Sequence, residues 1–361
     1  MPLYNTIVVK VGTNVLTRNN GLLDHTNISH LVDQIAVLKN QGIHVILVSS
    51  GAVGAGKSLM PTTSGLSKVV QRQVFSAVGQ VRLMETYRQL FYNYKLYCAQ
   101  LLVTKEDFRD RSHYLNMKHC FHALLRDNII PIVNENDVVA VSELMFTDND
   151  ELAGLVASMI NADALIILSS VDGLLDGPPD DPKSKVISRI DPGEKKWQRY
   201  ILPSRSSFGR GGMSTKFRIA QKAAKVGIAT YIANGRRPNI LTGILQEDFI
   251  GTQFTPKPVV SNLKKWIAYN ELGPKGKVLI NEGAEAAICS ASTVSSLLPI
   301  GIRSVEGDFQ KGDLIAILNE NGERIGLGIA QYGAHVAKQY IGQKGKKPLI
   351  HYDYMYVEKE H

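Results

Sequence analysis

The sequence predicts an α/β fold, a mostly parallel sheet sandwiched by helices, followed by a small β-rich barrel. Over the first two thirds of the chain, short β-branched runs alternate with amphipathic helical patterns, which is typical of parallel sheets covered on both faces. The last third carries short alternating runs separated by turn residues, which favours a small barrel. A chain of 361 residues is long enough for one large and one small domain.

The strands of the sheet are predicted from continuous apolar runs, because strands that are buried on both faces lose the polar alternation of half-exposed strands. The runs are residues 7–11, 45–48, 101–103, 129–133, 165–168 and 228–232. Helices are predicted between them, most clearly where apolar side chains from residue 28 to residue 38 share one stripe, with Thr26 as the expected N-cap and Gly42 as the stop. Two more helices are expected at 71–92 and 113–126.

A change in composition near residue 255 predicts the domain boundary. Prolines and a Gly-Pro pair between residues 256 and 274 indicate a linker, so we expect a larger domain at 1–255, a linker at 256–273 and a second domain at 274–361. Strands of the second domain are predicted at 278–280, 286–288, 314–318, 326–330 and 354–357, and Asn321-Gly322 favours a hairpin turn.

Composition indicates a soluble globular protein, with 44% hydrophobic and 20% charged residues. No apolar run reaches the roughly 18 residues that a membrane helix needs, and the N-terminus shows no export signal. Cys98, Cys120 and Cys289 have no metal-ligand spacing. We therefore expect reduced, buried cysteines, a cytoplasmic location, no membrane contact and no dedicated metal site.

The formal net charge of +8 resides in the larger domain. Residues 266–361 carry 10 Lys and Arg against 11 Asp and Glu, whereas the first 265 residues carry 31 against 22. The excess suits a polyanionic substrate such as a nucleotide, although a solvated basic surface explains it equally well. Because the second domain lacks a basic footprint, RNA is not an expected partner.

Two glycine-containing segments follow the first two predicted strands. Lys10 can direct its ammonium group at a phosphate while Gly12 lets backbone N–H groups approach, although an ordinary strand-end lysine is the alternative. Residues 49–56 leave little side-chain bulk between strand and helix, for a ligand or for packing alone. Residues 51–58 match GxxxxGK[ST], but a P-loop follows the first strand of its sheet, so we do not predict one.

Polar clusters follow later strands. Residues 134–137 and 147–151 hold five carboxylates and three carboxamides within eighteen residues, which favours a polar small-molecule site over a pair of turns. Residues 210–216, Arg-Gly-Gly-Met-Ser-Thr-Lys, lead into a helix predicted at 217–226. Glycines and a lysine at a helix N-terminus are typical of an anion site, and a simple loop and cap is the alternative.

Taken in order, these segments resemble the amino acid kinase family. The matching stretches are VVKVGTNVL, VSSGAVGAG, FSAVGQVRL, IVNENDVVA, TDNDEL and GRGGMSTK. The similarity continues through KKW into NEGAEAAI and SLLPIGIRSVEGDFQKGD, so that the second domain resembles a PUA domain. The SSGA, NEND and GGMSTK segments distinguish the glutamate-phosphorylating branch from aspartokinases, acetylglutamate kinases and UMP kinases.

The resemblance implies phosphorylation of the L-glutamate γ-carboxylate by ATP with Mg²⁺, giving glutamyl 5-phosphate for proline biosynthesis. The implied catalytic residues are Lys10, Lys216 and Asp150. The implied glutamate-binding residues are Ser50, Gly51, Asn134, Asp137, Asp148 and Asn149. The implied nucleotide-binding residues are Lys10, Gly12, Ser169, Ser170, Arg210, Gly211, Gly212, Met213, Ser214, Thr215 and Lys216.

Two positions depart from the family pattern. Ser169-Ser170 stands where the family has Thr-Asp, and Leu175 where Tyr is usual, which concerns nucleotide affinity or base preference. The resemblance also implies proline as a feedback inhibitor, a homo-oligomer, and hand-off of the labile acyl phosphate to glutamyl phosphate reductase. The alternatives are another carboxylate kinase of this fold, acting on aspartate or acetylglutamate, and a PUA-type RNA-binding protein.

Overall fold

The protein, described by a computed structural model, divides into two compact units, Met1–Val259 and Val260–His361. The structure describes residues 3–18, 20–60, 65–109, 111–139, 146, 148–178, 181, 183–191, 212–257, 274–290 and 295–357. Most of the linker predicted at 256–273 therefore lies outside the described residues, and the predicted boundaries stay a prediction.

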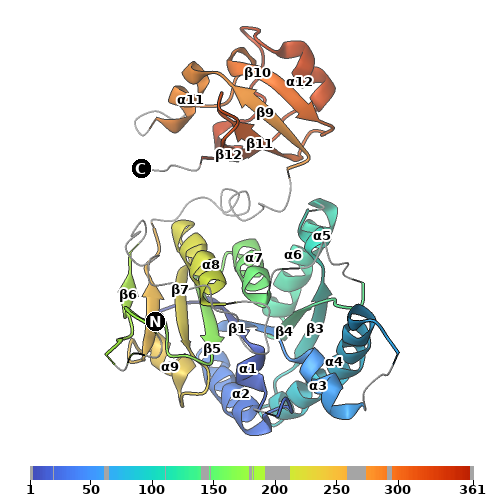
Figure 1. The fold of residues 1–361 in the computed structure, drawn as a ribbon, viewed down its shortest axis with the longest axis vertical. Helices are drawn as coiled ribbons and strands as arrows, with labels where there is room; N and C mark the ends of the chain where they lie inside the picture. Colours follow the sequence, from blue (N-terminus) through green and yellow to red (C-terminus); the bar gives the residue numbers. More distant parts are fainter. Residues whose placement is uncertain are drawn as a thin grey trace. The chain divides into compact units, whose positions relative to one another are not determined.

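The described residues of the first unit form an eight-stranded sheet (Figure 1). Its strands, in their order along the sheet, are β3 (Cys98–Val103), β4 (Ile130–Glu135), β2 (His44–Ser49), β1 (Thr6–Val11), β5 (Ala164–Ser169), β7 (Ala229–Asn234), β8 (Gly251–Phe254) and β6 (Arg189–Ile190). Neighbours from β3 to β7 pair in parallel, and β8 runs antiparallel to β7. The prediction of a mostly parallel sheet is confirmed.

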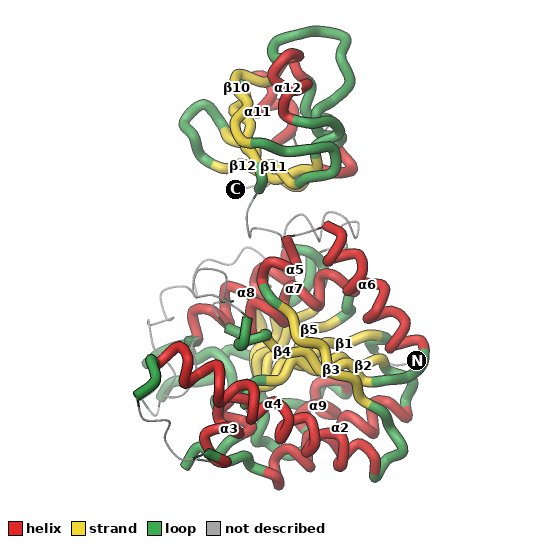
Figure 2. The backbone as a smooth tube through the Cα atoms, turned by 90° about the vertical axis from the view of Figure 1, so that its right-hand side faces the viewer, coloured by secondary structure: helices red, strands yellow, loops and turns green. Residues whose placement is uncertain are grey.

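Helices cover both faces of this sheet (Figure 2). One face carries α2 (His25–Asn40), α3 (Ala52–Leu59), α4 (Lys68–Tyr92) and α9 (Ile240–Leu245). The other face carries α5 (Lys105–Arg109), α6 (Arg111–Arg126), α7 (Asn149–Ile160) and α8 (Met213–Lys225). The short helix α1 (Thr13–Leu16) follows β1 directly. The predicted α/β sandwich is thus confirmed.

All six strands predicted from apolar runs are present, and β2, for example, covers residues 44–49 where 45–48 was expected. Strands β6 and β8 were not predicted, because they are short and lie at the far edge of the sheet. The expected N-cap Thr26 is wrong: the N-cap is Asp24, two residues earlier, whose carboxylate accepts the N–H of Asn27. Gly42, at φ +81°, does end the helix as predicted.

The second unit contains a five-stranded sheet in the order β10 (Ile302–Gly307), β9 (Gly276–Ile280), β11 (Leu314–Leu318), β12 (Arg324–Ile329) and β13 (Met355–Val357). Around it lie α11 (Glu282–Cys289), η3 (Pro299–Gly301), α12 (Ala334–Tyr340) and η4 (Tyr352–Tyr354). The strand predicted at 286–288 is wrong, because an Asn281 cap, early acidic residues and alanines favour α11. The β-rich character of this domain is confirmed.

The cysteine prediction is partly wrong. Cys98 and Cys289 are half-buried, but Cys120 is exposed on α6. In the described ranges of the chain we find no helix that combines the length and the apolar character needed to cross a bilayer.

The topology of the sheet indicates where a ligand would bind, at the carboxyl ends of the strands beside β1. Strands β2, β4 and β3 lie on one side of β1, whereas β5 and β7 lie on the other, so the winding direction changes at β1. In open α/β sheets a crevice forms at the carboxyl ends of the strands beside such a switch point. Lys10 occupies this end of β1.

Candidate active site

A cavity of about 660 Å³ opens beside the carboxyl ends of β1, β2, β4 and β5, a volume suited to a small-molecule ligand. Its lining brings together twelve of the predicted site residues: Lys10, Gly12, Ser50, Gly51, Asn134, Asp137, Asp148, Asn149, Asp150, Ser169, Ser170 and Lys216. These residues come from positions 10 to 216 of the chain, and the parallel sheet is what gathers them at one edge.

Two lysines meet at one carboxylate in this cavity. Lys10 Nζ lies 2.5 Å from Asp150 Oδ1, and Lys216 Nζ lies 2.9 Å from Asp150 Oδ2. The Asp150 side chain is fully buried, and both lysines are nearly so. Each of the three sits on a different element: Lys10 is the penultimate residue of β1, and Asp150 and Lys216 occupy the first turns of α7 and α8.

Sheet alternation explains why Lys10 reaches this carboxylate. Ile7, Val9 and Val11 belong to the apolar core beneath one face of the sheet, so Lys10 points to the opposite face. Helix α7 packs against β1 on that face and beside α8, which brings the two helix N-termini over the end of β1. The local sequence pattern thus directs one charged side chain out of an otherwise apolar strand.

The pKa values of Asp150 and Asp148 in this cluster are shifted in opposite directions. Burial alone would raise the pKa of Asp150, but the charges and hydrogen bonds of Lys10 and Lys216 hold that pKa below its ordinary value. Burial, followed by the negative charge of Asp150, raises the pKa of Asp148 to about 6. Asp148 caps α7 through Oδ1, which accepts the N–H groups of Asp150 and Glu151. Its buried Oδ2 has no hydrogen-bond partner among the described residues.

A hydrogen-bonded chain joins the predicted glutamate-binding residues. Asn149 Nδ2 donates to Ser50 Oγ at 2.9 Å and to Asn134 Oδ1 at 3.0 Å. Asn134 Nδ2 in turn donates to Gln80 Oε1 at 3.0 Å. The ends of β2 and β4 and the first residue of α7 are therefore linked by side chains at the cavity. Thr147 lies outside the described residues.

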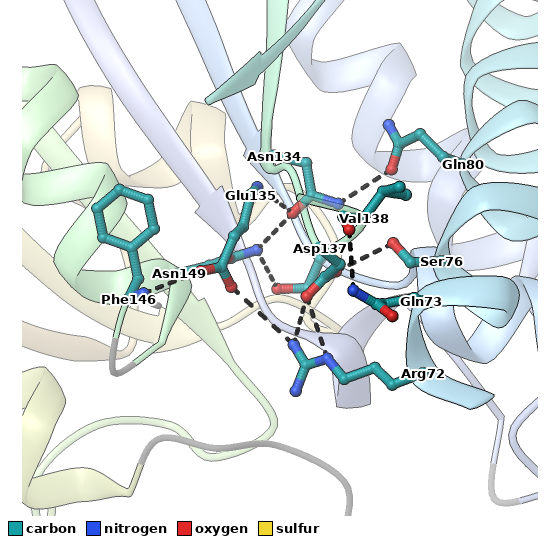
Figure 3. Close-up of polar contacts among 11 residues, drawn as sticks. Arg72, Gln73, Ser76, Gln80, Asn134, Glu135, Asp137, Val138, Phe146 and Asn149 are labelled. Carbon is teal, nitrogen blue, oxygen red and sulfur yellow. Dashed lines mark hydrogen bonds and ion pairs between the residues drawn. The ribbon is translucent and has the colours of Figure 1, made fainter. Parts of the chain in front are cut away.

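Helix α4 supplies residues that sequence reasoning missed (Figure 3). Arg72 donates to Asp137 Oδ1 from Nε at 3.1 Å and from Nη2 at 2.7 Å, and Ser76 Oγ lies 3.0 Å from Asp137 Oδ2. Arg72, Ser76 and Gln80 are four residues apart, so they share one face of the helix. That polar spacing inside an amphipathic helix is the pattern that could have identified them.

The glycine-rich segment after β2 is mostly helical. Gly51 has φ +105° and precedes α3, so seven of the eight residues of the P-loop-like match, 52–58, lie within a helix. A side chain at Gly51 would be strained at that positive φ. This geometry agrees with the expectation that the segment is not a P-loop.

The nucleotide-binding residues of the prediction are only partly at the cavity. Gly12, Ser169 and Ser170 line it. Gly212 is the N-cap of α8, and Met213, Ser214 and Thr215 form its first turn together with Lys216. Arg210 and Gly211 lie outside the described residues.

Comparisons with known proteins extend this description. Residues 5–234 match the Amino acid kinase family, and residues 276–352 match the PUA domain. The chain is 51% identical to a glutamate 5-kinase of Chlorobaculum tepidum over 99% of this chain and 98% of that protein. It is 50% identical to a glutamate 5-kinase of Bacteroides thetaiotaomicron over 98% of this chain and 99% of that protein.

Solved structures share the fold at low identity. Carbamate kinase from Giardia lamblia bound to AMP-PNP aligns with a TM-score of 0.54 at 20% identity, covering 71% of this chain and all of that one. An isopentenyl phosphate kinase from T. acidophilum aligns with a TM-score of 0.50 at 16% identity, over 69% of this chain and 99% of the other.

Proposed function

We infer from its membership of the amino acid kinase family, in which it belongs with the glutamate 5-kinases, that this chain transfers the γ-phosphoryl group of ATP to the side-chain carboxylate of L-glutamate. The product is glutamyl 5-phosphate, for proline biosynthesis. One observation of the site carries the proposal: two buried ammonium groups share the carboxylate of Asp150 in a cavity lined by acids and amides.

The two lysines suit phosphoryl transfer. In this reaction negative charge spreads over the three equatorial oxygens of the migrating group, so catalysis consists mainly of positioning and charge stabilisation. Lys10 and Lys216 hold positive charge on both sides of Asp150 in a nearly buried site. We assign them to opposite sides of the phosphoryl group, where a water-poor environment strengthens their effect.

Asp150 orients these lysines. A carboxylate acceptor is already a nucleophile at neutral pH, so the reaction needs no general base. Asp150 stays ionised because its pKa is held low, and each of its oxygens binds one ammonium group. Its role is therefore to fix the distance between the two charges.

The polar chain at the other end of the cavity suits glutamate. Ser50, Asn134 and Asn149 offer hydroxyl and amide groups, and Gly51, Asp137 and Asp148 complete the proposed pocket. Strands β1 and β4 are separated by β2, so their ends lie about 10 Å apart at ordinary strand spacing. That span accommodates a five-carbon amino acid between the lysines on one side and Asp137 on the other.

The nucleotide is assigned to Gly12, Ser169, Ser170 and the start of α8, residues 210–216, with Arg210 and Gly211 carried over from the family pattern alone. A helix N-terminus with Gly212 as N-cap offers backbone N–H groups to phosphate. Mg²⁺ carried by ATP would neutralise phosphate charge. Asp148 lines the cavity, and its carboxylate is an oxygen donor of the kind that such an ion prefers.

The test is hydroxamate trapping of the acyl phosphate with glutamate, aspartate and N-acetylglutamate, each with ATP and Mg²⁺. We expect hydroxamate from glutamate at a much higher kcat/KM than from the other acids. Hydroxamate from another acid and none from glutamate would show a different carboxylate kinase. Salt-sensitive RNA binding without any turnover of ATP would instead favour the RNA-binding alternative.

The remaining assignments are part of the same proposal. Proline, which shares the glutamate backbone, is assigned as a feedback inhibitor in the amino-acid pocket, and the chain as a cytoplasmic homo-oligomer. The acyl phosphate product hydrolyses readily, so we assign its hand-off to glutamyl phosphate reductase. RNA is not assigned as a partner, because the second domain carries no net positive charge.

A further inference from the structure

We propose that Arg72 recognises the α-carboxylate of the amino-acid substrate and thereby sets the preference for an amino acid over the same molecule without that charge. The inference deepens the proposed function and rests on it, because it assumes that glutamate occupies the cavity. Neither the predicted site residues nor the family resemblance includes Arg72.

Arg72 lines the cavity, and only part of its guanidinium group is used in hydrogen bonds to other side chains. Both hydrogen bonds to Asp137 Oδ1 use Nε and Nη2, and Nη2 also lies 4.0 Å from Glu135 Oε2. Nη1 makes no hydrogen bond within the described part of the chain. A guanidinium has five N–H donors in a planar fork, so two remain on Nη1 for a carboxylate.

Asp137 gives this arginine a fixed position. One oxygen of Asp137 accepts from Arg72, and the other accepts from Ser76 one helical turn further along α4. Figure 3 shows the two α4 side chains converging on the same carboxylate from one helix face. Because Asp137 is nearly buried, the pair is shielded from solvent on one side and holds a single geometry.

The pair complements an amino acid. A free α-amino acid carries an ammonium group and a carboxylate on adjacent atoms, and Asp137 and Arg72 present a carboxylate and a guanidinium side by side. The other cations of the cavity are placed differently: Lys10 and Lys216 bind Asp150, whereas Lys57 and Lys68 are exposed at its rim. Arg72 is therefore the partly buried cation beside the Asp137 end of the cavity.

The sheet separates this pair from the reacting end by a suitable distance. Lys10 lies near the end of β1 and Asp137 follows β4, two strand spacings away, or about 10 Å. An extended glutamate spans about 5 Å between its two carboxyl carbons, and hydrogen bonds add about 3 Å at each end. A substrate held by Arg72 can thus present its γ-carboxylate near Lys10.

The experiment compares two substrates that differ only at the α-carboxylate. Hydroxamate formation is measured with glutamate and with glutamate α-amide, whose γ-carboxylate is unchanged, in the wild type and in Arg72→Ala. We expect the wild type to prefer glutamate by about a hundredfold in kcat/KM, since a charge-assisted contact is lost in the amide. In Arg72→Ala the glutamate value should fall about a hundredfold and the amide value only a few-fold.

Three variants separate recognition from structure. Arg72→Lys keeps the charge without the fork, and we expect an intermediate preference, which also covers the case in which Arg72→Ala does not fold. Ser76→Ala loosens Asp137 without touching Arg72 and should lower both substrates equally. Arg88→Ala removes an arginine of the same helix that pairs with Glu85 outside the cavity, and should leave both values unchanged.

The outcomes are distinguishable. An unchanged preference in Arg72→Ala or Arg72→Lys, with both substrates reduced by the same factor, would overturn the proposal and leave Arg72 as a support for Asp137. A wild type that makes no hydroxamate from glutamate would overturn the proposed function, and this inference with it. If the ratio of kcat/KM for glutamate to that for the α-amide falls toward one in Arg72→Ala, the result supports both the proposed function and the role of Arg72.

Discussion

Gly56 of α3 and Gly79 of α4 face each other where the two helices cross. A Cβ at Gly79 would lie 1.8 Å from the carbonyl oxygen of Ala52 and 2.3 Å from the backbone nitrogen of Gly56. A Cβ at Gly56 would lie 1.9 Å from the carbonyl oxygen of Phe75. The backbones of the two helices are thus in contact, and this contact sets the position of the α4 face that reaches Asp137 and Asn134.

Gly79→Ala should therefore lower both stability and substrate binding. The added methyl group meets backbone rather than a flexible side chain, so α3 and α4 must move apart, at a cost of about 3 kcal/mol in the free energy of unfolding. The KM for glutamate should rise because Gln80 and Ser76 move with the helix. Gly54→Ala is the matched stability control on α3, since its Cβ would make only ordinary contacts at 3.4 Å and beyond. Equal denaturation midpoints for the two variants would contradict this account.

Lys10→Ala and Lys216→Ala should each reduce turnover by about a thousandfold or more, because each removes a fixed positive charge from a site of low dielectric. The measurement is kcat in the hydroxamate assay, with circular dichroism to confirm folding. Lys225→Ala, an exposed lysine at the far end of α8, is the control and should keep normal turnover. Near-normal turnover in both active-site variants would refute the roles assigned to them.

The pH dependence of activity and of stability should report the protonation of Asp148. Its pKa is raised to about 6, so the carboxylate is charged above pH 6 and neutral below it. We expect kcat/KM for glutamate to fall as the pH drops through about 6, and Asp148→Asn to lack that acid limb. The free energy of unfolding should change with pH in the opposite direction to kcat/KM. The folded state holds this proton more tightly than the unfolded state, so the free energy of unfolding of the wild type should fall relative to Asp148→Asn as the pH rises through 6. Parallel pH profiles would contradict the assignment.

The sequence sufficed for the sheet and for one end of the site. Strands such as β1 and β5 are mostly apolar runs, so their composition predicts that they are buried. The polar residues that follow them were correctly expected at one edge of the sheet. Lys10, Asp150 and Lys216 could be named from motifs. Their shared geometry depends on how α7 and α8 pack over β1, which no local pattern contains.

The residues on α4 were missed for a related reason. A polar side chain inside an amphipathic helix is ordinarily taken as part of the solvated face, and the sequence does not show that Arg72 faces Asp137, 65 positions away. The strand predicted at 286–288 failed in the other direction, because three apolar residues cannot be separated from a helix without the Asn281 cap. The first case depends on a contact that is distant in sequence, whereas the second depends on a local cap that lies just before the apolar run.

Arg236 ties the loop after β1 to the end of β7. Its Nη2 donates to the carbonyl oxygens of Asn14, within α1, and Thr17, the C-cap of α1, at 2.7 and 2.9 Å. Gly12, whose N–H donates to Leu168 O at 3.3 Å, begins the same loop and lines the cavity. The guanidinium therefore holds the segment that we assign to the ATP phosphates.

Arg236→Ala should raise the KM for ATP by about three- to tenfold, since hydrogen bonds from a charged group contribute about 1.5–3 kcal/mol and partial exposure reduces that value. The KM for glutamate should stay unchanged, because the amino-acid end of the cavity is held by α4 and α7. Arg237→Ala is the control: the neighbouring arginine binds Asp172 rather than the loop, so its loss should leave the KM for ATP near normal. If Arg236→Ala alters both KM values equally, the loop does not act on the nucleotide alone and its assignment to ATP fails.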